Sequence, residues 1–237
     1  MDSETFHIIS DSSCDLPEEY AAAHNVTVVP FYVRFGEEEY KKEIAEVSVR
    51  DFYRRMVDEP ENFPKSSMPA VQDFIDAMMP DVNAGVPSVV ICITVKFSGC
   101  YQSACNARDI ILSDHPDAKI AVIDSTINTV LQGLYVKEAI RLRDAGTSFE
   151  DAVAVLEEIK STGRIFFSVA NTNYLQGGYH PLGPGPLGCL LLASVFPTTA
   201  FAQELIVGGQ AVGIRIQTEG VLVSGVAQVE TEDGGSS

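Results

Sequence analysis

The stretch VVICITVKFSGCYQSACNA, residues 89–107, decides the fold. Its first seven residues, 89–95, are apolar and mostly β-branched, which is typical of a strand buried on both faces in a parallel sheet. After a turn at Ser98-Gly99, small and apolar residues recur at helical spacing from Cys100 to Leu112. The pattern predicts a strand, a short loop and a helix. In open α/β sheets, such loops at the carboxyl ends of strands bind ligands.

The same loop carries groups that can hold an anion. Thr94 and Ser98 offer hydroxyls, and the N–H groups of Gly99 and Cys100 open the following helix. A helix N-terminus favours negative charge because its first N–H groups have no partner within the helix. Ser98 also has a simpler interpretation, since serine is a preferred N-cap. Both roles stay open from the sequence.

Composition limits the class of partner. The 237 residues are 46% hydrophobic, enough to bury the core of one large or two small domains. With 33 Asp and Glu against 16 Lys and Arg, the net charge of −17 argues against nucleic acid or an anionic membrane surface. The five cysteines form no CxxC pair, and no apolar run reaches membrane-spanning length. We expect a cytoplasmic location, no membrane insertion, no metal and no cofactor.

Other apolar runs alternate with helical patterns along the chain. Strands are expected at 6–10, 26–35, 119–123 and 164–169. Helices are expected at 17–24, 48–59, 69–78, 127–144, 148–161 and 171–176. This alternation predicts an α/β fold with three layers, in which a mainly parallel sheet carries helices on both faces.

Small hydroxyl residues follow several of the expected strands. They occur at Asp11-Ser12-Ser13, at Thr94 with Ser98, and at Asp124-Ser125-Thr126, and an expected loop at 63–69 adds Ser66-Ser67. The carboxyl ends of parallel strands share one edge, so these groups could converge there. Neutral donors with little positive charge suit a carboxylate or carbonyl better than a di- or triphosphate. The same residues could instead all be turn formers.

Five motifs together resemble the DegV family, in its order and near its spacing, over about residues 5–178. The motifs are Ser-Asp-Ser-Ser-Cys-Asp-Leu-Pro at 10–17, Ser66-Ser67-Met68-Pro69 with Phe74, Phe97-Ser98-Gly99-Cys100-Tyr101-Gln102-Ser103-Ala104, Val122-Ile123-Asp124-Ser125, and Tyr174-Leu175 with Gly177-Gly178.

The resemblance implies a two-lobed α/β protein that binds one long-chain fatty acid. The acyl chain would lie in an apolar tunnel, and hydroxyls of two central loops would hold the carboxylate. In many bacteria such proteins present the fatty acid to a separate kinase, which phosphorylates the carboxylate. Ser66 stands where the family has its carboxylate-binding Thr, and Thr94 and Val95 stand at a Ser-Ser pair. The expected ligand-binding residues are Ser66, Ser67, Thr94, Ser98 and Gly99.

The sequence also departs from the family pattern. Val95 cannot donate a hydrogen bond, Lys96 replaces a Gly, Cys100 replaces a Thr, and Tyr179 replaces an Arg. Residues 177–237 hold 12 of the 18 glycines. We therefore expect a DegV-like α/β domain at 1–178 and a divergent Gly-rich segment at 179–237, so that the second lobe is incomplete. This segment is either a divergent lobe or the product of a reading-frame change.

An enzyme of another class is the alternative. Ser12, after the first strand, could be the nucleophile of a serine esterase or lipid hydrolase. Such a serine needs a positioned histidine. The sequence places none of the four histidines in a recognisable acid–His pair near a strand end. There is also no Walker loop. We therefore expect a carrier without a catalytic residue.

Overall fold

A computed structural model describes residues 6–165, which form two sheets and their helices. The strands are β1 (His7–Asp11), β2 (Val26–Val29), β3 (Tyr32–Phe35), β4 (Lys41–Lys42), β5 (Pro64–Ser67), β6 (Ser88–Cys92) and β7 (Ile120–Asp124). The helices are the 3₁₀ helix η1 (Ser12–Cys14) and the α-helices α1 (Glu18–Ala23), α2 (Val49–Asp58), α3 (Val71–Ala84), α4 (Cys100–Asp114), α5 (Thr129–Asp144) and α6 (Phe149–Ile159).

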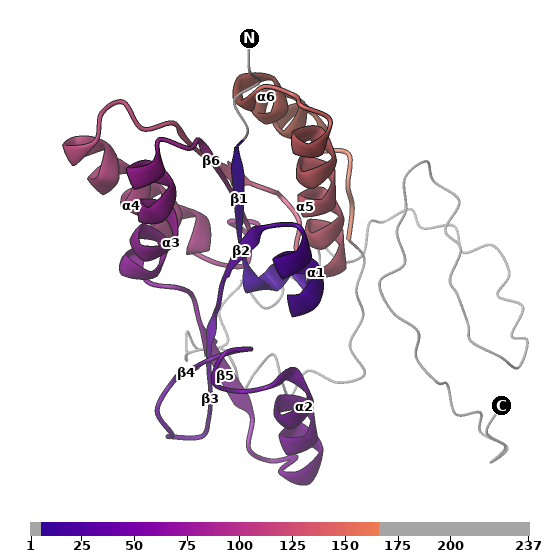
Figure 1. Ribbon diagram of the computed structural model, residues 1–237. Coiled ribbons are helices and arrows are strands. Elements are labelled where there is room, and N and C mark those ends of the chain that lie inside the picture. The colour runs from indigo at the N-terminus through magenta and orange to yellow at the C-terminus, as the bar shows by residue number, and fades with distance from the viewer. Residues whose placement is uncertain (1–5, 166–237) are drawn as a thin grey trace, which may run out of the picture. The chain divides into compact units, whose positions relative to one another are not determined.

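The main sheet is parallel, with strand order β2-β1-β6-β7. Helices α3 and α4 lie on one face, and α1, α5 and α6 lie on the other (Figure 1). Alternate strand residues serve the two cores, as the pleat requires. Ile8 and Val89 belong to the core on the α5 side, whereas Ile9 and Val90 belong to the core on the α3–α4 side. The expected three-layer α/β fold is confirmed.

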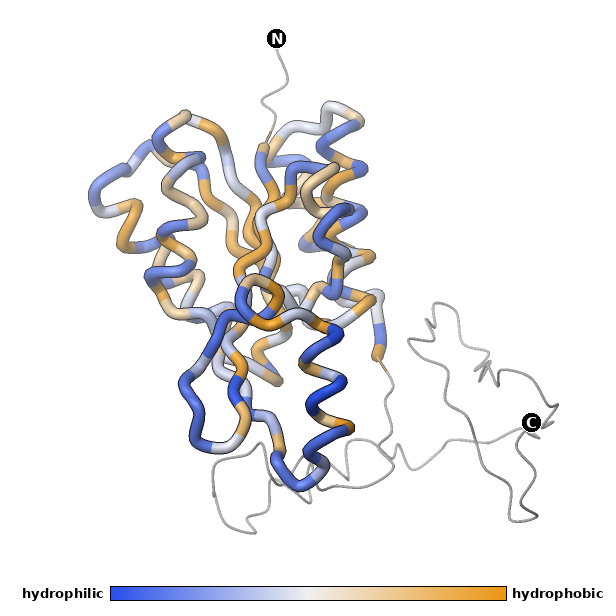
Figure 2. The backbone as a smooth tube through the Cα atoms, turned by 60° about the horizontal axis from the view of Figure 1, so that its bottom comes forward, coloured by the Kyte–Doolittle hydropathy of each residue, from blue (hydrophilic) through white to orange (hydrophobic). Residues whose placement is uncertain are grey.

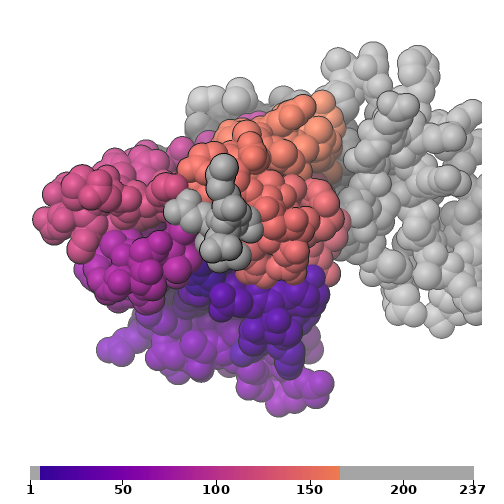
Figure 3. Space-filling model, turned by 45° about the horizontal axis from the view of Figure 1, so that its top comes forward, coloured from indigo at the N-terminus to yellow at the C-terminus, as the bar shows by residue number. Residues whose placement is uncertain are grey.

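The hydropathy of the chain follows these layers. Hydrophobic residues concentrate along the central strands (Figure 2), and all five residues of β6 are buried. In the space-filling view, the residues after 125 and the magenta residues that include α4 occupy adjoining regions of the surface (Figure 3). The strand expected at 89–95 is confirmed over 89–92 but wrong at 93–95, where the chain already turns, and the helix expected from Cys100 is confirmed.

A second, antiparallel sheet was not expected. Its strand order is β4-β3-β5, and α2 lies beside it (Figure 1). The single strand expected at 26–35 is wrong: Pro30 separates β2, an edge strand of the parallel sheet, from β3. Proline has no N–H to continue a ladder, so the chain changes sheets there. The loop expected at 63–69 is also wrong in part, because residues 64–67 pair with β3 as β5.

Salt-bridge and hydrogen-bond contacts join the second sheet to α3. Asp73 accepts hydrogen bonds from the hydroxyl of Tyr32 at 2.9 Å and from the ammonium of Lys42 at 3.0 Å. The N–H of Ala70 donates to the same carboxylate at 2.8 Å, which satisfies a free donor at the start of α3. Asp73 therefore connects β3 and β4 to the helix that covers the parallel sheet.

Several expectations fall outside the described residues. They are most of the strand at 164–169, the helix at 171–176, the domain boundary at 178, Tyr179 and the segment at 179–237. Within residues 6–165, no helix has the length and apolar character needed to cross a bilayer.

Candidate ligand-binding site

The end of β5 lies against the start of α4. A Cβ atom placed on Gly99 would lie 2.9 Å from the Sδ atom of Met68, so the two segments are close and a larger residue at 99 would require the Met68 side chain to move. The hydroxyl of Ser103 donates to the carbonyl of Pro69 at 3.0 Å. These two contacts bring the strand that carries Ser66 and Ser67 beside the loop that follows β6. We call Ser66, Ser67, Thr94, Ser98 and Gly99 the polar rim.

Thr94 is the buried member of the polar rim. Its N–H donates to the carbonyl of Ile127 at 2.9 Å, and its own carbonyl accepts from the N–H groups of Phe97 and Ser98. Its hydroxyl oxygen accepts only a long hydrogen bond, at 3.4 Å, from the N–H of Lys96. The backbone of Thr94 thus fixes the turn, while its hydroxyl proton is available to an acceptor.

Ser98 and Gly99 open α4 together. Gly99 takes the N-cap position by its backbone, and the hydroxyl oxygen of Ser98 accepts from the N–H of Cys100 at 3.2 Å. The interpretation of Ser98 as the N-cap is therefore wrong, because Gly99 takes that position, although the Ser98 hydroxyl still satisfies one N–H group at the start of α4. A hydroxyl that accepts one hydrogen bond can still donate its proton.

Ser66 and Ser67 are both exposed at the end of β5, opposite Val33 and Tyr32 of β3. Neither hydroxyl makes a side-chain hydrogen bond among the described residues. Successive side chains of a strand point to opposite faces of the sheet. At most one of these two hydroxyls can therefore face a given ligand group.

Apolar side chains stand next to these hydroxyls. Met68, Val95 and Phe97 are 45%, 52% and 44% exposed, although each is large and hydrophobic. Each lies within two residues of a member of the polar rim. The arrangement of neutral donors beside exposed apolar groups suits an amphiphilic molecule with a small polar head.

The polar end of β1 has a different role. The buried carboxylate of Asp11 accepts from five donors: the N–H and hydroxyl of Ser13, the amide of Gln132, the N–H of Ile93 and the thiol of Cys100. The distances lie between 2.5 and 3.1 Å for nitrogen and oxygen donors, and the thiol lies at 3.2 Å. We call this group the Asp11 hub. It joins β1, α4 and α5, and both carboxylate oxygens of Asp11 already accept hydrogen bonds.

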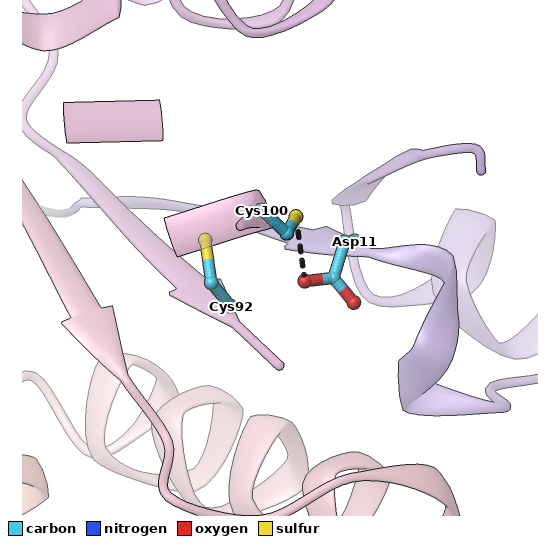
Figure 4. A group of neighbouring side chains, drawn as sticks. All are labelled: Asp11, Cys92 and Cys100. Carbon is cyan, nitrogen blue, oxygen red and sulfur yellow. Dashed lines mark hydrogen bonds between the residues drawn. The ribbon is translucent and has the colours of Figure 1, made fainter. Parts of the chain in front are cut away.

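Two thiols beside the Asp11 hub raise the question of a metal site. The ligand atoms of Asp11, Cys92 and Cys100 all lie within 4.8 Å of one another, in a fully buried cluster (Figure 4). The hydrogen bond with Cys92 and burial together raise the pKa of the Cys100 thiol far above its usual range. Thiolates are the form that binds metals, and both Asp11 oxygens already accept hydrogen bonds. The residues therefore fit a hydrogen-bonded core better than a cation site.

Ser12 is hydrogen-bonded to a carboxylate rather than to a histidine. Its hydroxyl donates to the carboxylate of Glu43 and accepts from the N–H of Phe31 at 2.9 Å. Burial, and the nearby charge of Glu43, raise the pKa of Asp15 in the same turn. A serine nucleophile needs a base that takes its proton and an unobstructed hydroxyl. These contacts give Ser12 a structural role, in joining β1 to the second sheet.

One acid–His pair that the sequence did not indicate is present. Nδ1 of His7 lies 2.7 Å from Oδ2 of Asp81, and Nε2 lies 3.3 Å from the hydroxyl of Thr27. The hydroxyl of Ser88 donates to the same carboxylate oxygen at 2.7 Å. His7 and Ser88 begin their strands, so this group lies at the amino edge of the sheet, opposite Ser12. It connects α3 to three strands.

The polar end of β7 is likewise occupied by its own turn. The N–H of Ser125 donates to the carbonyl of Cys92, and its hydroxyl donates to the carbonyl of Ile127. The hydroxyl of Thr126 donates to the carbonyl of Lys160 at 2.6 Å. Of the four polar stretches that the sequence suggested, those after β1 and β7 are used within the fold. Those at β5 and after β6 have hydroxyl donors without a partner among residues 6–165.

The fold and this edge define a class of protein: a three-layer α/β protein with a candidate ligand-binding edge at the carboxyl ends of its parallel strands. A family model described as "Uncharacterised protein, DegV family" matches residues 5–178. The chain therefore belongs to the DegV family, and the resemblance seen in the motifs is confirmed.

Relatives and solved structures agree with this assignment. The chain is 30% identical over 180 residues to a DegV domain-containing protein of Clostridium acetobutylicum, a match over 76% of this chain and 62% of that protein. It is similar, at 43% identity and a TM-score of 0.69, to a stearic acid-binding protein from Eubacterium ventriosum, over 73% of this chain and 59% of that one. A fatty-acid-binding DegV family protein from Thermus thermophilus matches at 25% identity and a TM-score of 0.64, over 73% of this chain and 60% of that one. The chain thus spans about three fifths of the length of these relatives.

Proposed function

We propose that the chain binds a long-chain fatty acid, with the carboxylate held by the polar rim and the acyl chain against apolar side chains. The observation that carries this proposal is the contact between the end of β5 and the start of α4. This contact supports the proposal, because it brings β5 and the start of α4 close together, where hydroxyls without a side-chain partner among residues 6–165 lie near exposed apolar side chains. The fatty-acid ligands of similar DegV structures support the same assignment.

The acyl chain and the carboxylate of such a ligand contribute differently to its binding free energy. Burial of about 15 methylenes at about 0.8 kcal/mol each gives an upper bound of about 12 kcal/mol before the costs of ordering. A neutral donor contributes about 0.5–1.5 kcal/mol net, and somewhat more to a charged acceptor. The acyl chain therefore supplies most of the affinity, and the rim selects an acid and fixes its direction. The tunnel that would enclose the chain is part of this proposal.

The head group also suggests what happens next. A carboxylate at the carboxyl edge, held by neutral hydroxyls, keeps its charge and its nucleophilic oxygen. The family resemblance implies a separate kinase that phosphorylates this carboxylate. We include that partner in the proposal, with the present chain as carrier rather than catalyst.

Mass spectrometry of extracted protein tests the proposal. The purified chain is denatured and extracted, and the extract is searched for C14–C20 acids; in parallel, native protein is incubated with oleate or palmitate and analysed for uptake. We expect a co-purified fatty acid or stoichiometric uptake. Absence of both, with folded protein, would show that the chain does not bind fatty acids. A reporter-ester assay on the same sample distinguishes a carrier from a hydrolase.

A further inference from the structure

Asn128 follows a residue that is hydrogen-bonded to the polar rim, and its side-chain amide has a buried oxygen without a hydrogen bond, which costs folding free energy. Its Oδ1 atom is buried and has no hydrogen-bond partner. Its Nδ2 atom is not among the buried unpartnered atoms and makes no hydrogen bond within the described residues. The amide therefore has its oxygen turned inward without a partner and its NH₂ group on the accessible side. Buried polar groups without partners are rare and call for an explanation.

Helix capping does not explain this side chain. Asn128 occupies the N-cap position of α5, and asparagine is among the best N-caps because its side-chain oxygen accepts an N–H from the first turn. Here the side chain makes no capping hydrogen bond. Only the backbone carbonyl of Asn128 serves the helix, as it accepts from the N–H of Gln132 at 3.3 Å.

The backbone on both sides of Asn128 is held in an unfavourable conformation. Thr126 has φ +62° and Thr129 has φ +52°. β-branched residues rarely adopt the left-handed region, and such strain persists only where surrounding contacts impose it. Those contacts are present: Thr126 is bonded to Lys160, and Ser125 to the carbonyl of Ile127.

The loop around Asn128 is fixed directly to the polar rim. The carbonyl of Ile127, the residue before Asn128, accepts the N–H of Thr94 at 2.9 Å. Asn128 is thus one residue away from a hydrogen bond to the buried member of the rim. Two apolar residues of α5 that follow it, Val130 and Leu134, are 43% and 40% exposed.

From these observations we infer that Asn128 is a further head-group ligand, whose amide NH₂ donates a hydrogen bond to the bound carboxylate. This inference rests on the proposed function and adds a specificity-determining residue to it. A donor that is oriented before the ligand arrives loses little freedom on binding. The outward NH₂ favours an anionic acceptor, and it would distinguish an acid from a neutral lipid of the same chain length.

Two ligands and two variants test the inference. Palmitate and hexadecanol, which share the chain length and differ in the head group, are titrated into wild type, Asn128→Ala and Asn128→Asp at neutral pH. Asn128→Ala is expected to weaken palmitate binding about tenfold, as the loss of a hydrogen bond to a charged group implies. Asn128→Asp is expected to weaken it further, because two carboxylates would face each other. Hexadecanol binding should change less than about twofold in Asn128→Ala.

Stability measurements and a matched control separate a ligand role from a structural one. Asn128→Ala removes a buried oxygen that has no partner, so its urea midpoint should equal or exceed that of wild type. The exposed Asn106 of α4 provides the control, and Asn106→Ala should leave both affinities unchanged.

The possible failures are distinct. Equal palmitate affinity in wild type and Asn128→Ala would remove Asn128 from the site while leaving the proposed function intact. An equal loss for palmitate and hexadecanol, with a lowered urea midpoint, would show that Asn128 acts through the fold, and would overturn the inference. A wild type that binds neither lipid would overturn the proposed function and this inference with it.

Discussion

The strand ends of this protein carry the same kinds of residues and use them in opposite ways. After β1, the carboxylate of Asp11 accepts five donors and no acceptor is left. At β5 and after β6, within the part of the chain that the structure describes, Ser66 and Ser67 make no side-chain hydrogen bond and the Ser98 hydroxyl accepts one. Saturated groups hold the layers together, whereas groups with spare donors can bind a ligand. Polar residues at a strand end are therefore candidates for a binding site only if the rest of the fold leaves some of their hydrogen-bond donors without a partner.

The strongest test of this contrast is removal of the Asp11 carboxylate. Asp11→Ala leaves buried donors from Ile93, Gln132 and Ser13 without an acceptor, so we expect a loss of about 3–5 kcal/mol in the free energy of unfolding. Urea denaturation followed by circular dichroism measures this loss. The control is Asp114→Ala at the exposed end of α4, which should change stability by less than about 0.5 kcal/mol. A similar, small effect for both variants would contradict a structural Asp11 hub.

The close approach of α5 to η1 supports the same hub. A Cβ on Gly133 would lie 2.4 Å from the carbonyl oxygen of Cys14, and backbone atoms cannot move aside cheaply. Gly133→Ala should cost about 1–3 kcal/mol by overpacking, in the same urea assay. Gly163→Ala is the matched control, because its Cβ would meet only side-chain atoms, those of Leu131 at 3.0 Å and of Ile127 at 3.5 Å. If the two variants were equally stable, α5 would not need this approach to reach Asp11.

The link between the second sheet and α3 should show in the pH dependence of stability. Burial acts to raise the pKa of Asp73, but Lys42, the N–H of Ala70 and Tyr32 outweigh it and hold the pKa below its ordinary value of 3.8. A depressed folded-state pKa stabilises the fold above 3.8, and this contribution is lost as the pH falls below 3.8 through the folded-state value.

Asp73→Asn removes this contribution, which we expect to be about 1 kcal/mol at neutral pH. Unfolding free energies of both proteins, measured by urea at several pH values, should differ most at neutral pH and converge in acid. A difference that stays constant across the acid range would show that the charge of Asp73 is not what stabilises this link.

Ser98 should give the smallest change in stability. Its hydroxyl accepts the N–H of Cys100 at the start of α4, so Ser98→Ala should cost about 0.5–1 kcal/mol. If the hydroxyl proton also reaches the carboxylate, palmitate affinity should fall as well, by about 1 kcal/mol. Thermal unfolding and titration of the same sample separate the two effects. Unchanged affinity in a variant of normal fold would limit Ser98 to satisfying that N–H group of α4.

The parallel sheet could be predicted from the sequence because a strand buried on both faces requires a continuous run of apolar residues. Val89 and Val90 have no exposed surface although they point to opposite faces, so the strand had to be apolar throughout. β5 has no such apolar run, since it is a polar edge strand whose conformation comes from pairing with β3. Its sequence therefore resembled a loop.

The site could be predicted only in part. Hydroxyls near strand ends and family motifs predict Ser66, Thr94 and Ser98 as ligand-binding residues, and the fold brings their segments close together. The partners that decide which hydroxyls remain free are distant in sequence: Gln132 is 121 residues from Asp11. The unpartnered oxygen of Asn128 depends on backbone torsions that no residue pattern encodes.

The most direct test of the central claim compares neighbouring hydroxyls of β5. Palmitate is titrated by calorimetry into wild type, Ser66→Ala and Ser67→Ala, with stability checked by urea. Because Ser66 and Ser67 point to opposite faces, the account predicts that Ser66→Ala weakens binding by about 1–3 kcal/mol while Ser67→Ala leaves it within about 0.5 kcal/mol. Binding of palmitate with equal affinity by all three proteins, at matched stability, would contradict the claim that the polar rim holds the carboxylate.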